Sequence, residues 1–169
     1  LNWNVGEAMV EGYTGVAMPV ILAGFIKLGF SPVEVSRGLG IGAYFLSLLF
    51  LWLILKKLKI DNLISAVTVL LYASTPVLFT HATSGLDTML FLATMFASIY
   101  TFFLMRPILF FSTLLFMSLV RPEGVMLSVC LIGTAAYYLY QNKSDKFKEF
   151  LQSFVCVYFI PALIYFLWR

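Results

Sequence analysis

The sequence has few charged residues. Aspartate, glutamate, lysine and arginine make up 11% of its 169 residues, whereas soluble domains carry about 25%. This composition argues against a soluble globular domain, and it excludes a disordered chain, which would need many more solvated side chains. The net charge of +3 comes from short basic clusters between apolar runs. Such clusters indicate membrane topology, and no nucleic-acid partner is expected.

Residues that commonly build metal or nucleophilic sites are also scarce. The chain has one histidine, so it cannot form a metal cage from several imidazoles, and no cysteine and histidine spacing fits zinc. The two cysteines, Cys130 and Cys156, fall inside apolar runs, where we expect small core residues rather than a disulfide. Neither a phosphate-binding loop of the GxxxxGK(S/T) type nor a GxSxG motif occurs.

Long apolar runs dominate the rest of the chain. With 62% hydrophobic residues and a mean hydropathy of +0.97, it is typical of a polytopic membrane protein. The candidate spans are residues 38–55, 63–80, 86–105, 108–120, 125–140 and 150–168. They predict an all-α transmembrane bundle of about six spans in one domain, because helices satisfy their own backbone groups in lipid. Since the sequence begins with Leu1, we expect a fragment of a longer chain.

A shorter apolar stretch precedes these runs. Residues 16–30 are interrupted by Pro19 and Lys27, and the stretch is too short for an ordinary span. We therefore expect one juxtamembrane helix, lying at the membrane surface rather than crossing the bilayer.

If that helix does not cross, the basic residues separate by side. One side receives Lys56, Lys57, Lys59, Arg106, Lys143, Lys146 and Lys148, and the other receives Arg37, Arg121 and Arg169. The positive-inside rule assigns the larger set to the cytoplasm. The other side is then extracytoplasmic, and the chain is expected to be a multi-pass protein of a bacterial plasma membrane, with the lipid bilayer as its partner.

Three short polar motifs fall on this extracytoplasmic side. Their functional candidates are Glu7, Glu11 and Tyr13 in the first, His81, Ser84 and Asp87 in the second, and Arg121 and Glu123 in the third. Ionisable residues at the ends of apolar helices are costly and often functional. Carboxylates can act as a base or hold a divalent cation, so such a cation is a candidate cofactor and its ligands stay open. An arginine guanidinium suits a phosphate.

Structural interpretations of these motifs stay open beside the functional ones. Ser84 and Asp87 have the spacing of an N-cap residue and an acidic residue at N3, close to a capping box. The segment from Arg121 to Glu123 fits the end of one helix and the start of the next, with proline at N1. His81 alone fits an interfacial polar residue.

The three motifs together resemble the GT-C superfamily of bacterial membrane glycosyltransferases, specifically the terminal arabinofuranosyltransferases. The first motif of that family typically reads NxGExVEGYT, and residues 4–14 read NVGEAMVEGYT. The second is commonly SGLET, and residues 84–88 read SGLDT, with aspartate in place of glutamate. The third, RPEG, occurs at residues 121–124. The resemblance covers residues 4 to about 125.

The resemblance implies transfer of a sugar from a polyprenyl-phosphate donor to an extracytoplasmic glycan, lipid or protein acceptor. On this hypothesis Arg121 contacts the donor phosphate, and Glu11, Asp87 and Glu123 are the catalytic candidates that bind hydroxyls or a cation. Tyr13 stacks on a sugar ring or holds the sugar nearest the lipid, and His81 and Ser84 donate hydrogen bonds. The family's usual first span and the acidic pair after it would lie upstream of Asn4, so the expected base is outside this sequence.

Two other functions stay open. The chain could be a small transporter or flippase component, whose polar residues would line a pathway near the middle of the membrane. The centres of the four best spans carry no charge, which favours chemistry at the membrane surface. A purely structural subunit would leave the clustering of the polar motifs unexplained.

Overall fold

A computed structural model describes residues 15–142 and 146–168, and this part of the chain folds into helices without a strand. The helices are α1 (Ala17–Lys27), α2 (Pro32–Lys57), α3 (Asn62–Ala73), α4 (Pro76–Thr83), α5 (Thr88–Phe103), α6 (Pro107–Val120), α7 (Glu123–Gln141), α8 (Phe147–Ser153), the π-helix η1 (Phe154–Phe159) and α9 (Ile160–Trp168).

Prolines define several helix starts. Pro32, Pro76 and Pro107 each occupy the first position of a helix, where the missing N–H costs nothing and the fixed φ suits the helix. Another proline, Pro161, follows η1 inside one continuous helical segment from α8 to α9. Because proline cannot donate the usual backbone hydrogen bond, it accounts for the wider π turns just before it.

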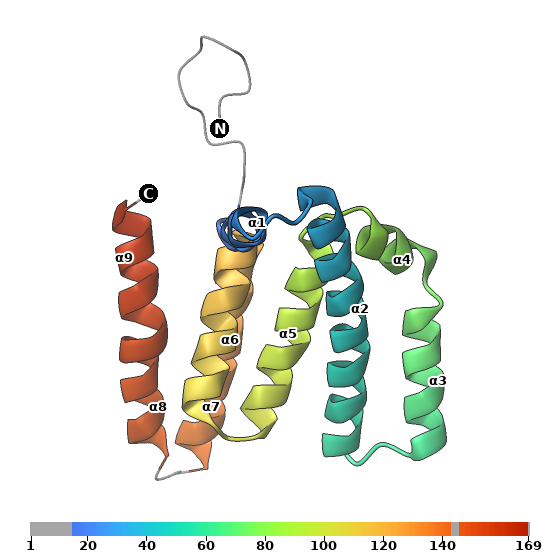
Figure 1. Ribbon diagram of the computed structural model, residues 1–169. Coiled ribbons are helices and arrows are strands. Elements are labelled where there is room, and N and C mark those ends of the chain that lie inside the picture. The colour runs from blue at the N-terminus through green and yellow to red at the C-terminus, as the bar shows by residue number, and fades with distance from the viewer. Residues whose placement is uncertain (1–14, 143–145, 169) are drawn as a thin grey trace.

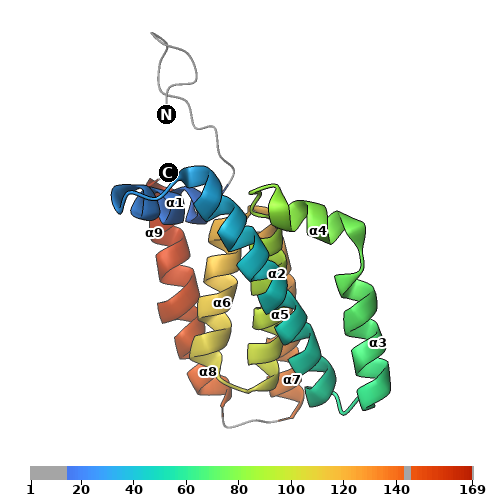
Figure 2. The ribbon, with the colours of Figure 1, turned by 45° about the vertical axis from the view of Figure 1, so that its right-hand side comes forward.

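The helices form a bundle with two helices lying across one of its ends. Figures 1 and 2 show α2, α5, α6, α7 and the α8–α9 segment running side by side, with α1 and α4 crossing the same end of the bundle. The stretch expected to lie at the membrane surface therefore forms a helix, α1, that does not run along the bundle axis.

The described part contains three helices long and apolar enough to cross a membrane: α2, α7 and the segment Phe147–Trp168. The bent pair α3–α4 makes a fourth if it counts as one span, with a bend of 57°. The all-α membrane bundle is therefore confirmed, but the expected number of about six spans is not supported. Helices α5 and α6 have only 16 and 14 residues, and a 14-residue helix is about 21 Å long against about 30 Å of hydrocarbon.

The buried core centres on α6. Its side chains Phe110, Phe111, Leu114 and Met117 are fully covered and pack with α7, α8 and η1. Between α2, α4 and α5 a second cluster is made largely of small residues, which let these helices approach closely. Large apolar side chains remain on the outer surface, as on a protein that faces lipid.

Hydroxyl groups join helices inside the bundle. Ser118 of α6 contacts the hydroxyls of Ser128 and Tyr158, each at 3.1 Å, and so connects α6 with α7 and η1. The hydroxyl of Tyr44 donates to the carbonyl of Ala73 at 2.7 Å and connects α2 with α3. Such interhelical bonds stabilise a bundle where lipid tails provide no hydrophobic drive between helices.

Candidate functional site

Arg121 lies in the turn between α6 and α7. Its backbone is extended, with φ −146° and ψ 145°, and the following Pro122 disfavours a helical conformation there, so α6 ends at Val120. Helix α7 then begins at Glu123. Gly124 allows the sharp return, because a Cβ atom at this position would come within 2.4 Å of the Met117 carbonyl oxygen. The RPEG motif therefore brings Arg121 and Glu123 together at one end of the bundle.

Asp87 reaches the same end from the turn between α4 and α5. Gly85 has φ +77°, a conformation that glycine adopts without strain, and it turns the chain after α4. Asp87 occupies the N-cap of α5, yet its side chain makes no capping hydrogen bond.

The capping-box interpretation of Ser84 and Asp87, which the sequence left open, is therefore wrong. Ser84 terminates α4 instead of starting α5, and its hydroxyl donates to the His81 carbonyl at 3.0 Å. The physical reason is the left-handed turn at Gly85, which ends one helix before the next begins.

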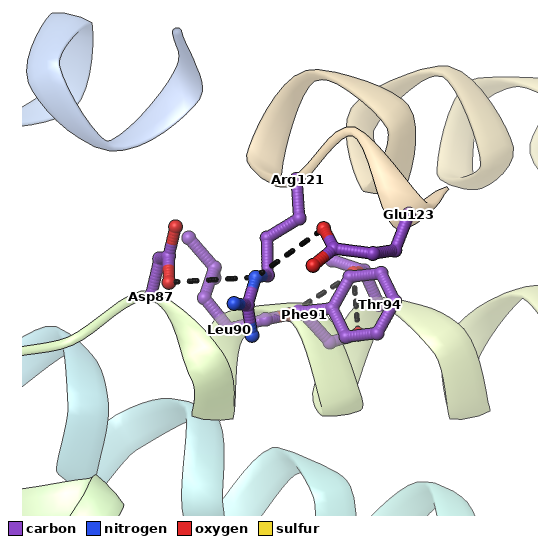
Figure 3. A network of polar contacts seen from close by, with 6 residues as sticks. All are labelled: Asp87, Leu90, Phe91, Thr94, Arg121 and Glu123. Carbon is purple, nitrogen blue, oxygen red and sulfur yellow. Dashed lines mark hydrogen bonds and ion pairs between the residues drawn. The ribbon is translucent and has the colours of Figure 1, made fainter. Parts of the chain in front are cut away.

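Figure 3 shows the Arg121 guanidinium between two carboxylates. Its Nε lies 3.9 Å from Oδ1 of Asp87 and 3.7 Å from Oε2 of Glu123. We call Arg121, Asp87 and Glu123 the arginine–carboxylate cluster. Asp87 and Glu123 stand at the N-termini of α5 and α7, where the positive ends of the helix dipoles favour negative charge.

The ionic contacts within the cluster are long. Both separations exceed hydrogen-bonding distance, and the buried Nε of Arg121 has no hydrogen-bond partner among the described residues. A buried donor without a hydrogen-bond acceptor is costly, so an oxygen atom that came within hydrogen-bonding distance of Nε would be stabilised. The side chains of Arg121 and Asp87 remain 32% and 24% exposed, and the cluster is therefore accessible.

Phe91 completes the surroundings of Arg121, and sequence reasoning missed it. The guanidinium carbon lies 5.9 Å from the centroid of the Phe91 ring, within cation–π range. Phe91 follows Asp87 by four residues, so both occupy the same face at the start of α5 (Figure 3). The spacing of four residues from Asp87 could have indicated Phe91. However, one apolar residue in an apolar helix does not stand out in the sequence.

His81 and Ser84 are not part of this cluster. Within the described ranges neither forms a hydrogen bond or ion pair with Arg121, Asp87 or Glu123. His81 is partly buried in α4, and its Nδ1 is a buried nitrogen without a hydrogen-bond partner. Helix α4 packs on α2 through the close contact of Gly40 with Ala82.

The first motif lies outside the described residues, and so do its candidates Glu7, Glu11 and Tyr13. The structure begins at Gly15, which is buried against the end of α6. A Cβ atom on Gly15 would overlap the carbonyl oxygen of Val120, the residue before Arg121. The described chain therefore begins beside the end of α6 that leads into Arg121.

A metal site is not assembled by the described residues alone. They contain no group of three or more histidine, cysteine, aspartate or glutamate side chains that could hold an ion. Asp87 and Glu123 would supply two carboxylates, and the Arg121 guanidinium stands between them. A divalent cation here would need further ligands from outside the described ranges.

An apolar groove begins at the same end of α7 as the cluster. It has a volume of about 480 Å³ and runs between α7 and the η1–α9 segment, with Val125, Val129 and Gly133 on the α7 side and Tyr158 and Leu163 opposite. Val125 follows Glu123 by two residues, so the groove and the cluster share the first turn of α7 but lie on different sides of this helix.

Comparison of the chain with family models, curated proteins and solved structures finds no match. The functional argument therefore rests on the motifs and on the geometry of the described residues.

Proposed function

We propose that this chain is part of a membrane-embedded glycosyltransferase that moves a sugar from a polyprenyl-phosphate donor to an extracytoplasmic glycan, lipid or protein acceptor. The observation that carries the proposal is the arginine–carboxylate cluster, in which two separate motifs contribute a cation and two carboxylates to one end of an apolar bundle. The resemblance to GT-C enzymes, read from all three motifs, supports the same reaction.

Arg121 would bind the phosphate of the donor. Its Nε has no hydrogen-bond partner among the described groups, and its planar fork can donate two parallel bonds to phosphate oxygens. In the reaction the acceptor oxygen bonds to the anomeric carbon, and the bond from that carbon to the phosphate oxygen breaks. Polyprenyl phosphate leaves with the bonding electrons, and Arg121 stabilises the negative charge that develops on it.

The carboxylates would bind hydroxyl groups of the substrates and take up the proton of the acceptor hydroxyl. Asp87 and Glu123 lie on either side of Arg121, so a sugar bound at the phosphate would have acceptors for its hydroxyls within reach. The acceptor hydroxyl loses its proton to a carboxylate, and the candidates that this sequence contains are Glu11, Asp87 and Glu123. Tyr13, His81 and Ser84 would bind the substrate around this centre.

The groove along α7 would receive the lipid part of the donor. It is lined almost entirely by apolar side chains and begins at the end of α7 that carries Glu123. An amphiphile with a phosphate at Arg121, and an isoprenoid chain that passes around the start of α7 into this groove, would match both the charge and the hydrophobicity of this end of the bundle.

The distribution of basic residues supports an extracytoplasmic site in a bacterial plasma membrane. Lys56, Lys57, Arg106, Lys146 and Lys148 lie at the ends of helices opposite the cluster (Figure 1). We include α5 and α6 among the spans, which gives about six, because both pack lengthwise between longer helices. Short helices are accommodated by local thinning of the bilayer.

The transporter alternative is less well supported. Charged side chains in the described ranges lie in connections or in the first two or last two turns of the helices, and a transport pathway would need some near the middle of the spans. The glycosyltransferase proposal accounts for their place at the ends.

Substitution of Arg121 tests the proposal. The full-length protein, reconstituted in proteoliposomes, would be given polyprenyl-phosphate sugars with a labelled sugar, arabinofuranose first, and transfer to an envelope glycan acceptor would be measured. We expect Arg121→Gln to reduce transfer by about 100-fold or more, since removal of one stabiliser of developing charge costs about 10²–10³ in rate.

Arg37→Gln is the matched control. Arg37 is exposed near the start of α2, at the same end of the bundle, and forms no ion pair among the described residues. Its loss should leave transfer within about twofold of wild type, because surface substitutions have small effects. Wild-type transfer by Arg121→Gln would overturn the proposal.

A further inference from the structure

A second groove lies at the opposite end of the bundle, where α5, α6 and α8 meet. It has a volume of about 440 Å³, and its lining includes Arg106, Lys146, Ile108 and Leu109. None of the residues assigned to sugar transfer contributes to it. We propose that this groove binds the headgroup of an anionic phospholipid.

Two cations face the groove from different connections of the bundle. Arg106 precedes α6, is exposed, and forms no ion pair within the part of the chain that the structure describes. Lys146 precedes α8, and its Nζ donates to the carbonyl of Met105 at 3.4 Å. This contact holds the ammonium group beside the turn that carries Arg106. The two side chains therefore present positive charge to a phosphate from two sides.

One carboxylate, Glu149, also lines the groove, so the groove's side chains carry a net charge of +1: Arg106 and Lys146 together contribute two positive charges and Glu149 one negative. The surrounding end of the bundle adds Lys56, Lys57, Lys59 and Lys148. A phosphodiester with one negative charge would balance the charge of the groove. Its other polar groups can accept a hydrogen bond from Lys146 or donate one to Glu149. Phosphatidylglycerol has this chemistry, with one phosphate charge and two free hydroxyls.

Apolar side chains beside the cations favour a lipid over free phosphate. Ile108 and Leu109 are 59% and 43% exposed in the first turn of α6, directly after Arg106 and Pro107. They continue the groove toward the apolar outer surface of the bundle, where acyl chains would lie. A free phosphate ion would use the cations and leave these side chains without a partner.

Lipid retention by the purified full chain tests the assignment. Delipidated protein would be titrated with phosphatidylglycerol or phosphatidylcholine of the same acyl chains, and the bound lipid counted by native mass spectrometry. We expect wild type to prefer phosphatidylglycerol. Arg106→Gln should weaken its binding about fivefold, because one basic residue near an anionic lipid contributes about that factor. Lys146→Gln should weaken the binding of phosphatidylglycerol by a similar factor.

Lys59→Gln is the matched control, since Lys59 is exposed at the same end but does not line the groove. It should change binding less than twofold. The site assignment is overturned if Lys59→Gln and Arg106→Gln weaken binding equally, or if wild type does not distinguish the two lipids. Displacement of phosphatidylglycerol by millimolar inorganic phosphate, with Ile108→Ser having no effect on lipid affinity, would identify an ion site and also contradict it.

Discussion

At the scale of single residues, the unusual feature is an arginine that is close to two carboxylates and hydrogen-bonded to neither. The Nε of Arg121 lies 3.9 Å from Asp87 and 3.7 Å from Glu123. A pair kept only for stability would gain from closer, bidentate geometry. The open arrangement keeps donors of the guanidinium for a substrate, and the Phe91 ring supports the cation from one side.

Asp87 gives a prediction at this scale. Asp87→Asn removes the negative charge but keeps the size of the side chain, and we expect it to lower sugar transfer at least tenfold, as loss of a hydrogen bond to a charged group costs about 1.5–3 kcal/mol. Asp87→Glu restores the residue that the related motif commonly has. It should retain transfer within about threefold of wild type, the cost of slightly displacing a carboxylate.

The same assay of labelled sugar transfer measures both variants. Equal activity of Asp87→Asn and wild type would show that the charge of this carboxylate has no part in the reaction. Equal loss in both variants would contradict the prediction that a carboxylate one methylene further from the backbone can replace Asp87.

At the scale of elements, the site depends on how closely α7 returns along α6. Gly124 would place a Cβ atom 2.4 Å from the Met117 carbonyl oxygen and 3.0 Å from Cα of Ser118. These are backbone atoms, so a side chain could be accommodated only by moving one helix. The hydroxyls of Ser118 and Ser128 face each other one turn further along the same contact.

We therefore predict that Gly124→Ala destabilises the bundle. The displacement of α7 should cost about 1–3 kcal/mol, the usual range for overpacking. Thermal unfolding in detergent would then occur several degrees lower, at about 2–4 °C for each kcal/mol in a chain of this length.

Gly133→Ala in the same helix is the control. Apart from the adjoining backbone of α7, no atom lies within 4 Å of the position that its Cβ would occupy, so this substitution should keep or slightly raise the Tm. If both substitutions lower the Tm equally, the close approach of α6 and α7 is not what requires glycine at residue 124.

At the scale of the whole molecule, the two ends of the bundle differ in chemistry while its sides are apolar. One end contains the arginine–carboxylate cluster, with α1 and α4 lying across it, and the other contains the basic connections (Figures 1 and 2). Separation of charge of this kind orients a protein in a membrane. It also separates the proposed sugar-transfer site from the proposed phospholipid site by the length of the bundle.

Much of this arrangement could be predicted from the sequence. Alternating apolar runs and basic clusters indicated the helices and their two sides, and they implied that Asp87, Arg121 and Glu123 would share one end. The structure supports three or four long spans rather than about six, because apolar composition does not reveal where a helix stops. The apolar run at 86–105 has 20 residues but α5 has 16, because this helix starts after Asp87 and ends before Met105, which has a positive φ of 53°. Helix α6 has 14 residues and matches its run at 108–120, which was already short.

Local signals also failed where tertiary contacts decide. The spacing of Ser84 and Asp87 fits a capping box, but the left-handed Gly85 ends α4 and leaves the Asp87 side chain to Arg121. The ring of Phe91 became part of the site only because α6 ends directly beside α5. The sequence alone does not show how far apart the motifs lie in space, and it does not show the groove along α7.

The central claim is that Arg121 recognises the phosphate of a polyprenyl lipid, and a binding measurement tests it most directly. The full-length protein would be titrated with labelled polyprenyl phosphate or with the uncharged polyprenol of equal length, in excess phosphatidylglycerol to occupy the groove at the other end. We predict that wild type prefers the phosphate by about tenfold or more, the value of a charge-assisted hydrogen bond. Arg121→Gln should lose this preference, and Arg37→Gln should keep it. An undiminished preference in Arg121→Gln would contradict the account.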